Sequence, residues 1–561
     1  MVTWGDVIRW SPQPLAEVVG VLNNRYNQLI GCADELRGTA MPEGWAGPAA
    51  NAAASKANQL ADDAEELAAE GAMLRRAAGD VSDAITGVLN GVAEAQSLAA
   101  AHEFRIGDDG SITGGPPPVC TTEDPDGSIA AADNQRIVTE LQDRVQEVLR
   151  SAEDVDNDFC TVLDRILSSH VIDPGSNSTD LAAAGNSGAA LGSLSIPPPP
   201  AGDGTPADNA AWWATLSPNQ RAVLAHDHPE LVGPRDGLPT EARGGANKVL
   251  LDRTRTDLAH QRDDIQHQID GLRHTAGGDI VLNDQAAYDR LKKQLDDING
   301  ELGGVDAIYE RLNHPVNGQN AFLLKIDPSN AGKAIIAAGN PDTAQNVATF
   351  VPGTGSGLGD IGGNMYRSDL MLRSADDAGS ESTAVITWVG YDAPPTIPDA
   401  ASTSYANNAE QPLHNFQDGL RETHQGTPAH TTVIGHSYGT TAVGQTARDH
   451  GLAANDLVFV GSPGVGVEHA NQLHLEGVPS DQTGHNVFSS NAPTDPVPAL
   501  TNFDNPLADD IDPLGPDPTT SWFGGQTFES DAHNPLHSHS DYWDAGSSSL
   551  REMGKVIAGN P

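Results

Sequence analysis

Residues 432–439, with the sequence TVIGHSYG, decide the predicted fold. They carry a short apolar run at 431–434 into a Gly-x-Ser-x-Gly pattern, and the stretch 440–450 that follows is typical of a helix. Glycine makes up 59 of the 561 residues, so the bare pattern would arise by chance on the order of half a time, and only its strand-to-helix context gives it weight. A turn this tight leaves no room for a Cβ on either side of the serine. The motif predicts Ser437 as a nucleophile at the C-terminal edge of a sheet; the alternative is a glycine-rich structural turn with an inert serine.

Short β-rich apolar runs surround this motif from residue 321 onward. They lie at 322–326, 334–338, 347–351, 384–389, 431–434, 457–460 and 487–489. Continuous apolar strands separated by crossovers predict a mainly parallel sheet that is buried on both faces. The first two runs are joined by a short turn and are expected to form an antiparallel edge pair.

Partners for the serine follow it in the chain. A serine hydroxyl needs a base, and in the α/β-hydrolase fold the order is serine, acid, histidine. Asp495 follows the run that ends near residue 490, where the acid is expected, although an aspartate there can also open a turn before proline. For the base we prefer His539 over His537. The alternative is that this region binds a metal ion. Its ligands would come from Asp531, His533, His537, His539 and Asp541.

An oxyanion hole needs two backbone donors. The amide of Tyr438 is the first, because it follows the nucleophile. The glycine-rich loop after the run 347–351 supplies the second, from Thr354 or Gly355. A phosphate-binding loop is the alternative, but no lysine follows at Walker spacing. The substrate pocket is expected to include Trp388, Tyr391 and His436, although an aromatic residue at a strand end is as often part of the core.

The first hundred residues predict an antiparallel helical hairpin. Apolar residues recur seven apart at Leu15, Leu22, Leu29 and Leu36, and again at Leu60, Leu67, Leu74, Val81 and Val88. The break between them contains Trp45-Ala46-Gly47. Here the chain resembles the WXG-type helical hairpins of type VII secretion systems, which act as export substrates or partner-binding modules. The Tyr-x-x-x-acid signal that such systems usually recognise is replaced by residues 104–108, FRIGD.

Composition restricts the partners. The chain has 31 lysines and arginines against 77 aspartates and glutamates, a net charge of −46, which disfavours nucleic acid and anionic lipid surfaces. The three cysteines, Cys32, Cys120 and Cys160, show no metal-ligand spacing. We expect neither a cleaved signal peptide nor a membrane span.

From about residue 197 the chain resembles an actinobacterial α/β-hydrolase family long catalogued as a domain of unknown function. The matching stretches are 197–202, 212–213, 233–239, 246–247, 352–354, 388–392, 435–439, 461–464, 495–497 and 539–543. The resemblance favours His539 over His537 and places the helical stretch 210–315 in the hydrolase unit. The expected organisation is a helical hairpin at 1–106, a helical segment at 107–170, a Pro/Gly/Ser-rich linker at 171–210, a helical segment at 211–315 and a catalytic domain at 316–561.

The sequence therefore predicts an all-α hairpin region followed by an α/β-hydrolase fold. We expect hydrolysis of a small-molecule or lipid ester or thioester, without a cofactor or metal, and a helical protein as partner of the hairpin. The chain is expected in the cytoplasm or exported by a type VII-like route. The alternative is an inactive hydrolase fold that serves as an interaction protein.

Overall fold

The computed structural model describes residues 2–39, 44–118, 127–168, 171, 181–202, 204–276, 279–282, 284–501, 514–531 and 538–561. The chain forms two compact units. Unit 1 comprises residues 1–117, 134–202 and 211–222, and unit 2 comprises residues 118–133, 203–210 and 223–561. No helix in the described ranges is long and apolar enough to span a bilayer.

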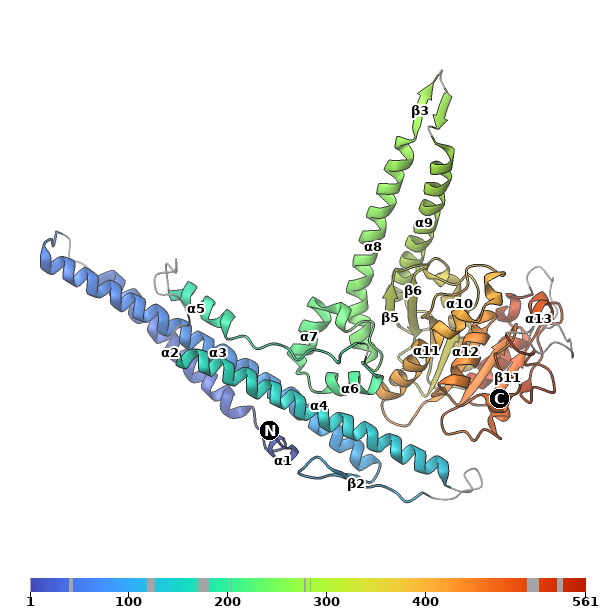
Figure 1. Ribbon diagram of the computed structural model, residues 1–561, viewed down its shortest axis with the longest axis horizontal. Helices are drawn as coiled ribbons and strands as arrows, with labels where there is room; N and C mark the ends of the chain where they lie inside the picture. The colour runs from blue at the N-terminus through green and yellow to red at the C-terminus, as the bar shows by residue number, and fades with distance from the viewer. Residues whose placement is uncertain are drawn as a thin grey trace. The chain divides into compact units, whose positions relative to one another are not determined.

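Unit 1 is mainly helical (Figure 1). Its elements are α1 (Trp4–Val7), α2 (Gln13–Thr39), α3 (Pro48–Ala101), α4 (Ser128–Leu167), α5 (Leu181–Leu191) and a small antiparallel pair, β1 (Phe104–Ile106) and β2 (Ile112–Gly114). The predicted hairpin of α2 and α3 is present. Arg75 donates a hydrogen bond to Asn23 at 3.1 Å and Ser82 donates to the carbonyl of Pro12 at 3.2 Å, so the two helices run antiparallel.

The apolar stripe of α3 differs from the predicted one. Leu60 and Leu67 are 42% and 55% exposed, because small residues, Ala68, Ala69 and Ala72, face inward there instead. Small residues also let α5 pack closely against α3: a Cβ on Gly188 would lie 2.0 Å from the carbonyl oxygen of Ala69. This helix lies inside the segment expected to be a linker.

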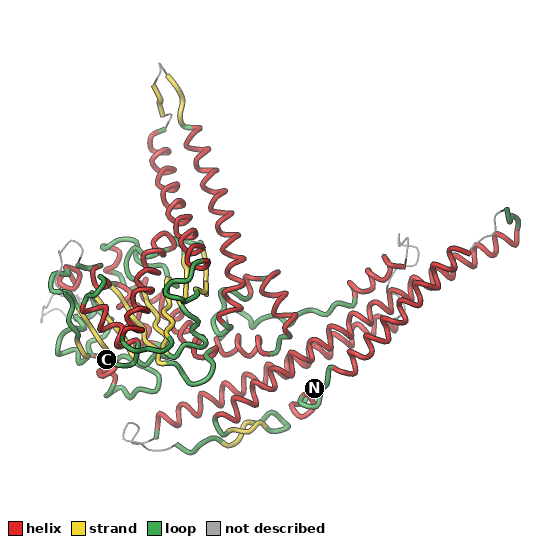
Figure 2. The backbone as a smooth tube through the Cα atoms, turned by 180° about the vertical axis from the view of Figure 1, so that it is seen from behind, coloured by secondary structure: helices red, strands yellow, loops and turns green. Residues whose placement is uncertain are grey.

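Helices precede the sheet in the chain. They are α6 (Pro206–Ala214), α7 (Pro218–Asp227), α8 (Thr240–Gly271) and α9 (Gln285–Asn313). Residues 211–222 belong to unit 1, where Trp212 donates its indole N–H to the carbonyl of Pro197 at 3.0 Å. The predicted hairpin of α8 and α9 is confirmed, and its far end carries an unpredicted antiparallel pair, β3 (Arg273–Ala276) and β4 (Asp279–Leu282) (Figure 2).

The sheet of unit 2 confirms the prediction of a mainly parallel sheet. Its strands are β5 (Ala321–Asp327), β6 (Lys333–Ala338), β7 (Asn346–Val351), β8 (Thr383–Val389), β9 (His430–His436), β10 (Asp456–Val460), β11 (Val487–Ser490) and β12 (Gln526–Thr527). The spatial order is β12-β11-β10-β9-β7-β8-β6-β5. Strand β6 pairs antiparallel with β5 and β8, and the remaining pairs are parallel. The expected antiparallel edge pair is therefore present.

Helices cover both faces of this sheet. The helices α11 (Ser404–Thr423) and α12 (Tyr438–Asp449) bury residues such as Phe416 and Val443 in one core. On the other face, α10 (Ile361–Asp377) and α14 (Ser548–Ile557) bury Met371 and Met553 in a second core. A short helix, α13 (Pro496–Thr501), follows β11. Strand β9 lies near the middle of the sheet, so its C-terminal end is held from both sides.

Candidate active site

Ser437 sits at a strained turn between β9 and α12. Its φ of 54° and ψ of −131° lie in a region that residues with a side chain rarely adopt. Its amide donates to the carbonyl of Val460 at 3.0 Å, which ties the turn to β10. A Cβ on Gly435 would lie 2.6 Å from the Cα of Thr440, and one on Gly439 would lie 2.1 Å from the carbonyl oxygen of Val351. The turn therefore requires glycine on both sides of the serine.

Asp495 and His539 are joined by a hydrogen bond. His539 Nδ1 lies 2.8 Å from Asp495 Oδ2, and the aspartate side chain is fully buried whereas the histidine is 25% exposed. Tyr542 donates its hydroxyl to the same oxygen at 2.7 Å, and the amide of Val497 donates to Oδ1 at 2.9 Å. Burial raises the pKa of Asp495, but the hydrogen bond and charge of His539 and these other donors outweigh it, so the pKa is lowered. The carboxylate is therefore ionised at neutral pH.

This pair lies beside the backbone that carries Ser437. Val460 is the register partner of His436 across β9 and β10, and the next residue, Gly461, has a φ of 58°. A Cβ there would lie 3.0 Å from Asp495 Oδ2 and 3.2 Å from His539 Nδ1. His436 Nε2 is 2.8 Å from the carbonyl oxygen of His539. The structure thus brings residues 437, 495 and 539 to one edge of the sheet.

His436 does not have the position expected of a pocket residue. It is 5% exposed, and its ring packs against His539 at 4.8 Å and Trp543 at 4.9 Å between centroids. Burial lowers the pKa of His436 well below 6.5, with the charges of His539 and Arg367 acting in the same direction. The neutral ring therefore carries its proton on Nε2 and donates it to the carbonyl of His539. Through this hydrogen bond His436 supports the backbone of His539. Its side chain is buried in the core, so it does not face the substrate.

This burial predicts a pH dependence of stability. The unfolded chain protonates His436 below about pH 6.5 while the folded chain does not, so the unfolded state binds more protons and stability falls as the pH falls. We therefore measure the decrease in melting temperature between pH 8 and pH 5.5. We expect it to be smaller for His436→Gln, which keeps an N–H donor, than for wild type. The exposed His226 provides the control variant His226→Gln, which should melt with the wild-type pH dependence. Equal losses in all three proteins would contradict the assignment.

The backbone amides predicted to form the oxyanion hole differ in whether another hydrogen bond already uses them. The amide of Tyr438 is the first of α12 and has no partner within the helix. The loop after β7 passes directly over it, since a Cβ on Gly353 would lie 2.7 Å from Ser437 Cβ and 2.8 Å from Tyr438 N. The amide of Gly355 donates to the carbonyl of Pro394 at 2.8 Å. This bond occupies Gly355 and leaves Thr354 as the candidate for the second donor.

Trp388 and Tyr391 belong to the core beside this loop. Their rings stack at 5.9 Å, and both are buried. The hydroxyl of Tyr391 donates to the carbonyl of Pro352 at 2.9 Å, so it positions the loop that carries Thr354. Trp388 lines a cavity whose lining contains none of Ser437, Asp495 and His539. The expectation that these aromatic residues form an acyl pocket finds no support in this placement.

Two residues at the site were not predicted from sequence. Tyr542 holds Asp495 through a hydrogen bond, and Gly461 leaves room for His539. In the sequence, the only indication of either residue was that it lies in a stretch that carries the family resemblance. Within the described ranges, no three His, Cys, Asp or Glu side chains are grouped so that they could hold a metal ion. His533 and His537, the other histidines of the metal alternative, lie outside the described residues.

Comparisons with known proteins agree with this architecture. The sequence profile of a family described as alpha/beta hydrolase matches residues 327–505. An uncharacterized protein of Mycobacterium tuberculosis strain H37Rv is 33% identical over 408 residues, which cover 65% of this chain and 57% of the relative. An uncharacterized protein of Mycobacterium bovis is 32% identical over 165 residues, 28% of this chain and 62% of the relative. The chain thus spans less than two thirds of these relatives.

Solved structures were also matched. An esterase of Pyrobaculum calidifontis aligns with a TM-score of 0.30 and 12% identity over 48% of this chain and 96% of that chain. The esterase LipW of Mycobacterium marinum aligns with a TM-score of 0.29 and 11% identity over 49% and 91%. The family profile and the sheet topology identify an α/β-hydrolase fold in the C-terminal region, after a helical N-terminal region.

Proposed function

We propose that unit 2 is a serine hydrolase that cleaves an ester or thioester by acyl transfer to water. The observation that carries this proposal is the hydrogen bond between His539 and a buried, ionised Asp495, next to a serine in a strained turn. An inert structural turn has no need of such a pair. The hydrolase family profile over residues 327–505 supports the same reaction class.

Each side chain has a role that follows from its contacts. The carboxylate of Asp495 accepts the Nδ1 proton of His539, which leaves Nε2 unprotonated and able to take the proton of Ser437 as the hydroxyl attacks the carbonyl carbon. Tyr542 and Val497 hold the carboxylate in place. The amides of Tyr438 and Thr354 stabilise the oxyanion, and the same histidine then protonates the leaving group. A second round with water releases the acid and restores the serine.

The proposal predicts turnover of activated esters. We expect the purified chain to hydrolyse p-nitrophenyl esters, with a rate that depends on acyl chain length because an acyl pocket discriminates by ~1–3 kcal/mol per methylene. Release of p-nitrophenol measures this directly, and Asp495→Asn is the matched variant, expected to lose about 10⁴-fold in kcat because the histidine takes the wrong tautomer.

No turnover of any oxygen ester or thioester by well-folded protein would favour the alternative, an inactive hydrolase fold that serves as an interaction protein. Equal turnover by wild type and Asp495→Asn would remove the aspartate from the mechanism while leaving the hydrolase intact.

For unit 1 we propose a non-catalytic role in binding a helical protein partner. The observation that favours it is the set of exposed large apolar side chains on the α2–α3 hairpin, Val18, Val21, Trp45, Leu60 and Leu67. They lie on both helices and near the turn, and a partner helix packed along the hairpin would remove them from water. The Trp-x-Gly at the turn of the hairpin favours export by a type VII-like route, which detection of the intact chain in culture filtrate would test.

A further inference from the structure

The loop that follows β10 holds the backbone of Ser437 on both sides. The amide of Ser437 donates to the carbonyl of Val460 at 3.0 Å. Its carbonyl accepts two hydrogen bonds from Thr440, one from the backbone amide at 2.9 Å and one from the side-chain hydroxyl at 2.7 Å. That hydroxyl lies 2.7 Å from the hydroxyl of Ser462, two residues after Val460. Residues 460–462 therefore hold Ser437 directly at its amide and, through Thr440, at its carbonyl.

The direction of these hydroxyl bonds follows from the protons available, because each hydroxyl has one proton to donate. The other acceptor near Thr440 is the carbonyl of Gly464, which is 3.5 Å away and accepts a shorter bond of 2.7 Å from Thr441. Thr440 therefore donates to the carbonyl of Ser437, and Ser462 donates to Thr440. Ser462 accepts in turn from the amide of Gly464 at 3.0 Å. Hydrogen bonds that follow one another in this way strengthen each other.

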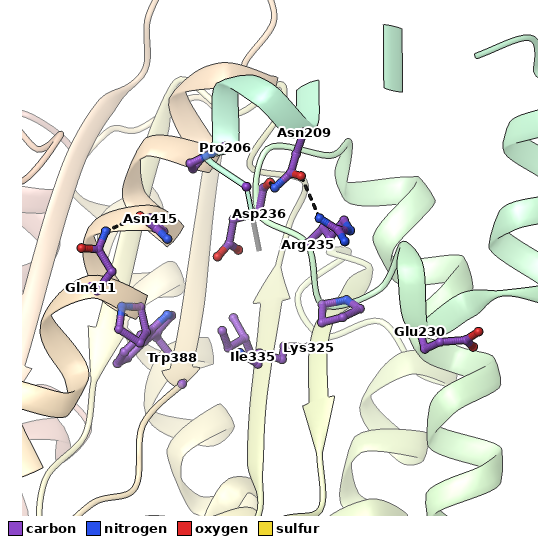
Figure 3. Close-up of a pocket in the computed structure, with 14 residues that line it drawn as sticks. Pro206, Asn209, Glu230, Arg235, Asp236, Lys325, Ile335, Trp388, Gln411 and Asn415 are labelled. Carbon is purple, nitrogen blue, oxygen red and sulfur yellow. Dashed lines mark hydrogen bonds between the residues drawn. The ribbon is translucent and has the colours of Figure 1, made fainter. Parts of the chain in front are cut away.

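The two hydroxyls are shielded from solvent. Thr440 and Ser462 are each 0% exposed, so water does not compete for their hydrogen bonds. Neither residue lines the cavity shown in Figure 3. Both hydroxyl protons already have acceptors within the protein, so the pair offers no free donor to a ligand. Its effect is on the conformation of the turn.

The same hydrogen bonds extend to the loop that carries the acid. The backbone amide of Ser462 donates to Oδ1 of Asn491 at 3.2 Å. The amide group of Asn491 is itself fixed, since its Nδ2 donates to Asp517 at 2.9 Å. Asn491 lies at the start of the loop that leads from β11 to Asp495. Ser462 is therefore bonded both to the turn of the nucleophile, through Thr440, and to the loop of the acid.

We propose, on the basis of the hydrolysis proposed above, that Thr440 and Ser462 are positioning residues of the active site. A residue with a side chain keeps a sparsely populated conformation only where the surrounding structure holds it, and the φ of 54° at Ser437 is such a conformation. By holding the carbonyl of Ser437, the two hydroxyls fix the direction of its side chain relative to His539. Without them, proton transfer to the histidine becomes slower, while the binding of substrate is unchanged.

Thr440→Val tests this role, because valine removes the hydroxyl with little change of shape. With the best p-nitrophenyl ester we expect kcat to fall by about ten- to hundredfold, since a misplacement of about 1 Å in an active site can cost ~10²-fold. KM should keep its wild-type value. Thr440→Ser retains the hydroxyl and should recover most of the lost rate.

Thr446→Val is the matched control. Thr446 lies in the same helix, is 0% exposed, and donates its hydroxyl to the carbonyl of Ala442 at 2.7 Å. The same substitution thus removes a buried hydrogen bond of the same kind that does not involve Ser437. Both valine variants should have a lower melting temperature than wild type. Only Thr440→Val should have a lower kcat, so the control separates positioning from a loss of stability.

The proposal would be overturned if Thr440→Val had the kcat of Thr446→Val, or if Thr440→Ser were as slow as Thr440→Val. Circular dichroism reports whether Thr440→Val folds. If it does not, Ser462→Ala decides alone, with an expected loss of about tenfold in kcat and an unchanged KM. Failure of the proposed hydrolysis gives a different result, because wild type and all variants would then turn over no ester, and both proposals would be contradicted together.

Discussion

Replacing Ser437 with alanine is expected to lower kcat/KM for ester hydrolysis by about 10⁴ to 10⁶-fold, the range found when the nucleophile of a triad is lost. The physical reason is that no acyl-enzyme can form without the hydroxyl, while the oxyanion donors and the base remain. Stability should change little, because the positive φ is strained for alanine as it is for serine. Initial rates with the best p-nitrophenyl ester, measured together with the melting temperature, check both parts.

A matched control comes from the loop that follows β7. Ser356 is partly exposed there and its amide donates to Gly353, so Ser356→Ala alters a neighbouring serine without touching the turn. It should keep more than about a tenth of the wild-type rate, since single surface changes of this kind cost little. A Ser437→Ala protein that hydrolyses esters at the rate of this control would contradict the assignment of the nucleophile.

Gly439→Ala is expected to have a large structural effect in unit 2. The added Cβ would lie 2.1 Å from the carbonyl oxygen of Val351 and 3.0 Å from that of Pro352, so α12 must move away from β7. Overpacking of this kind costs ~1–3 kcal/mol or more, and it also displaces the amide of Tyr438 from the oxyanion site. We expect a melting temperature lower by several degrees and a loss of kcat of at least about 100-fold.

The control for this prediction is Gly363→Ala. Gly363 lies inside α10, and a Cβ there would meet nothing within 4 Å. Alanine is favoured over glycine in a helix by about 1 kcal/mol, so this variant should be as stable as wild type or more stable, with unchanged activity. If Gly439→Ala has the same melting temperature and the same kcat as Gly363→Ala, the close approach of α12 to β7 is not needed to position the active site.

The sequence was sufficient to predict the sheet because its strands are continuous apolar runs. Each predicted run lies within one of the strands β5 to β11, and the antiparallel position of β5 followed from its short turn to β6. Strand β12 was missed, since Gln526–Thr527 is a two-residue polar strand at the sheet edge. The elbow at Ser437 was predictable because its strand, its two glycines and its helix follow one another directly in the chain.

Other features depend on packing that periodicity does not encode. Heptad counting assigned Leu60 and Leu67 to a buried stripe, but small alanines take the inner positions of α3 and allow α5 to approach. His436 was expected in the substrate pocket; the alternation of side chains along the strand turns it into the core instead. The hydroxyl of Tyr542 on Asp495 joins residues 47 positions apart, which no local pattern reveals.

Labelling with a fluorophosphonate probe, followed by peptide mapping, tests the central claim most directly. The probe reacts only with a serine whose hydroxyl is activated by a base and whose oxyanion is stabilised, so it needs no knowledge of the substrate. We predict one adduct per chain, on the peptide that contains Ser437, absent in Ser437→Ala and strongly slowed in His539→Ala. Folded wild-type protein that forms no adduct, or forms it on another serine, would contradict the account.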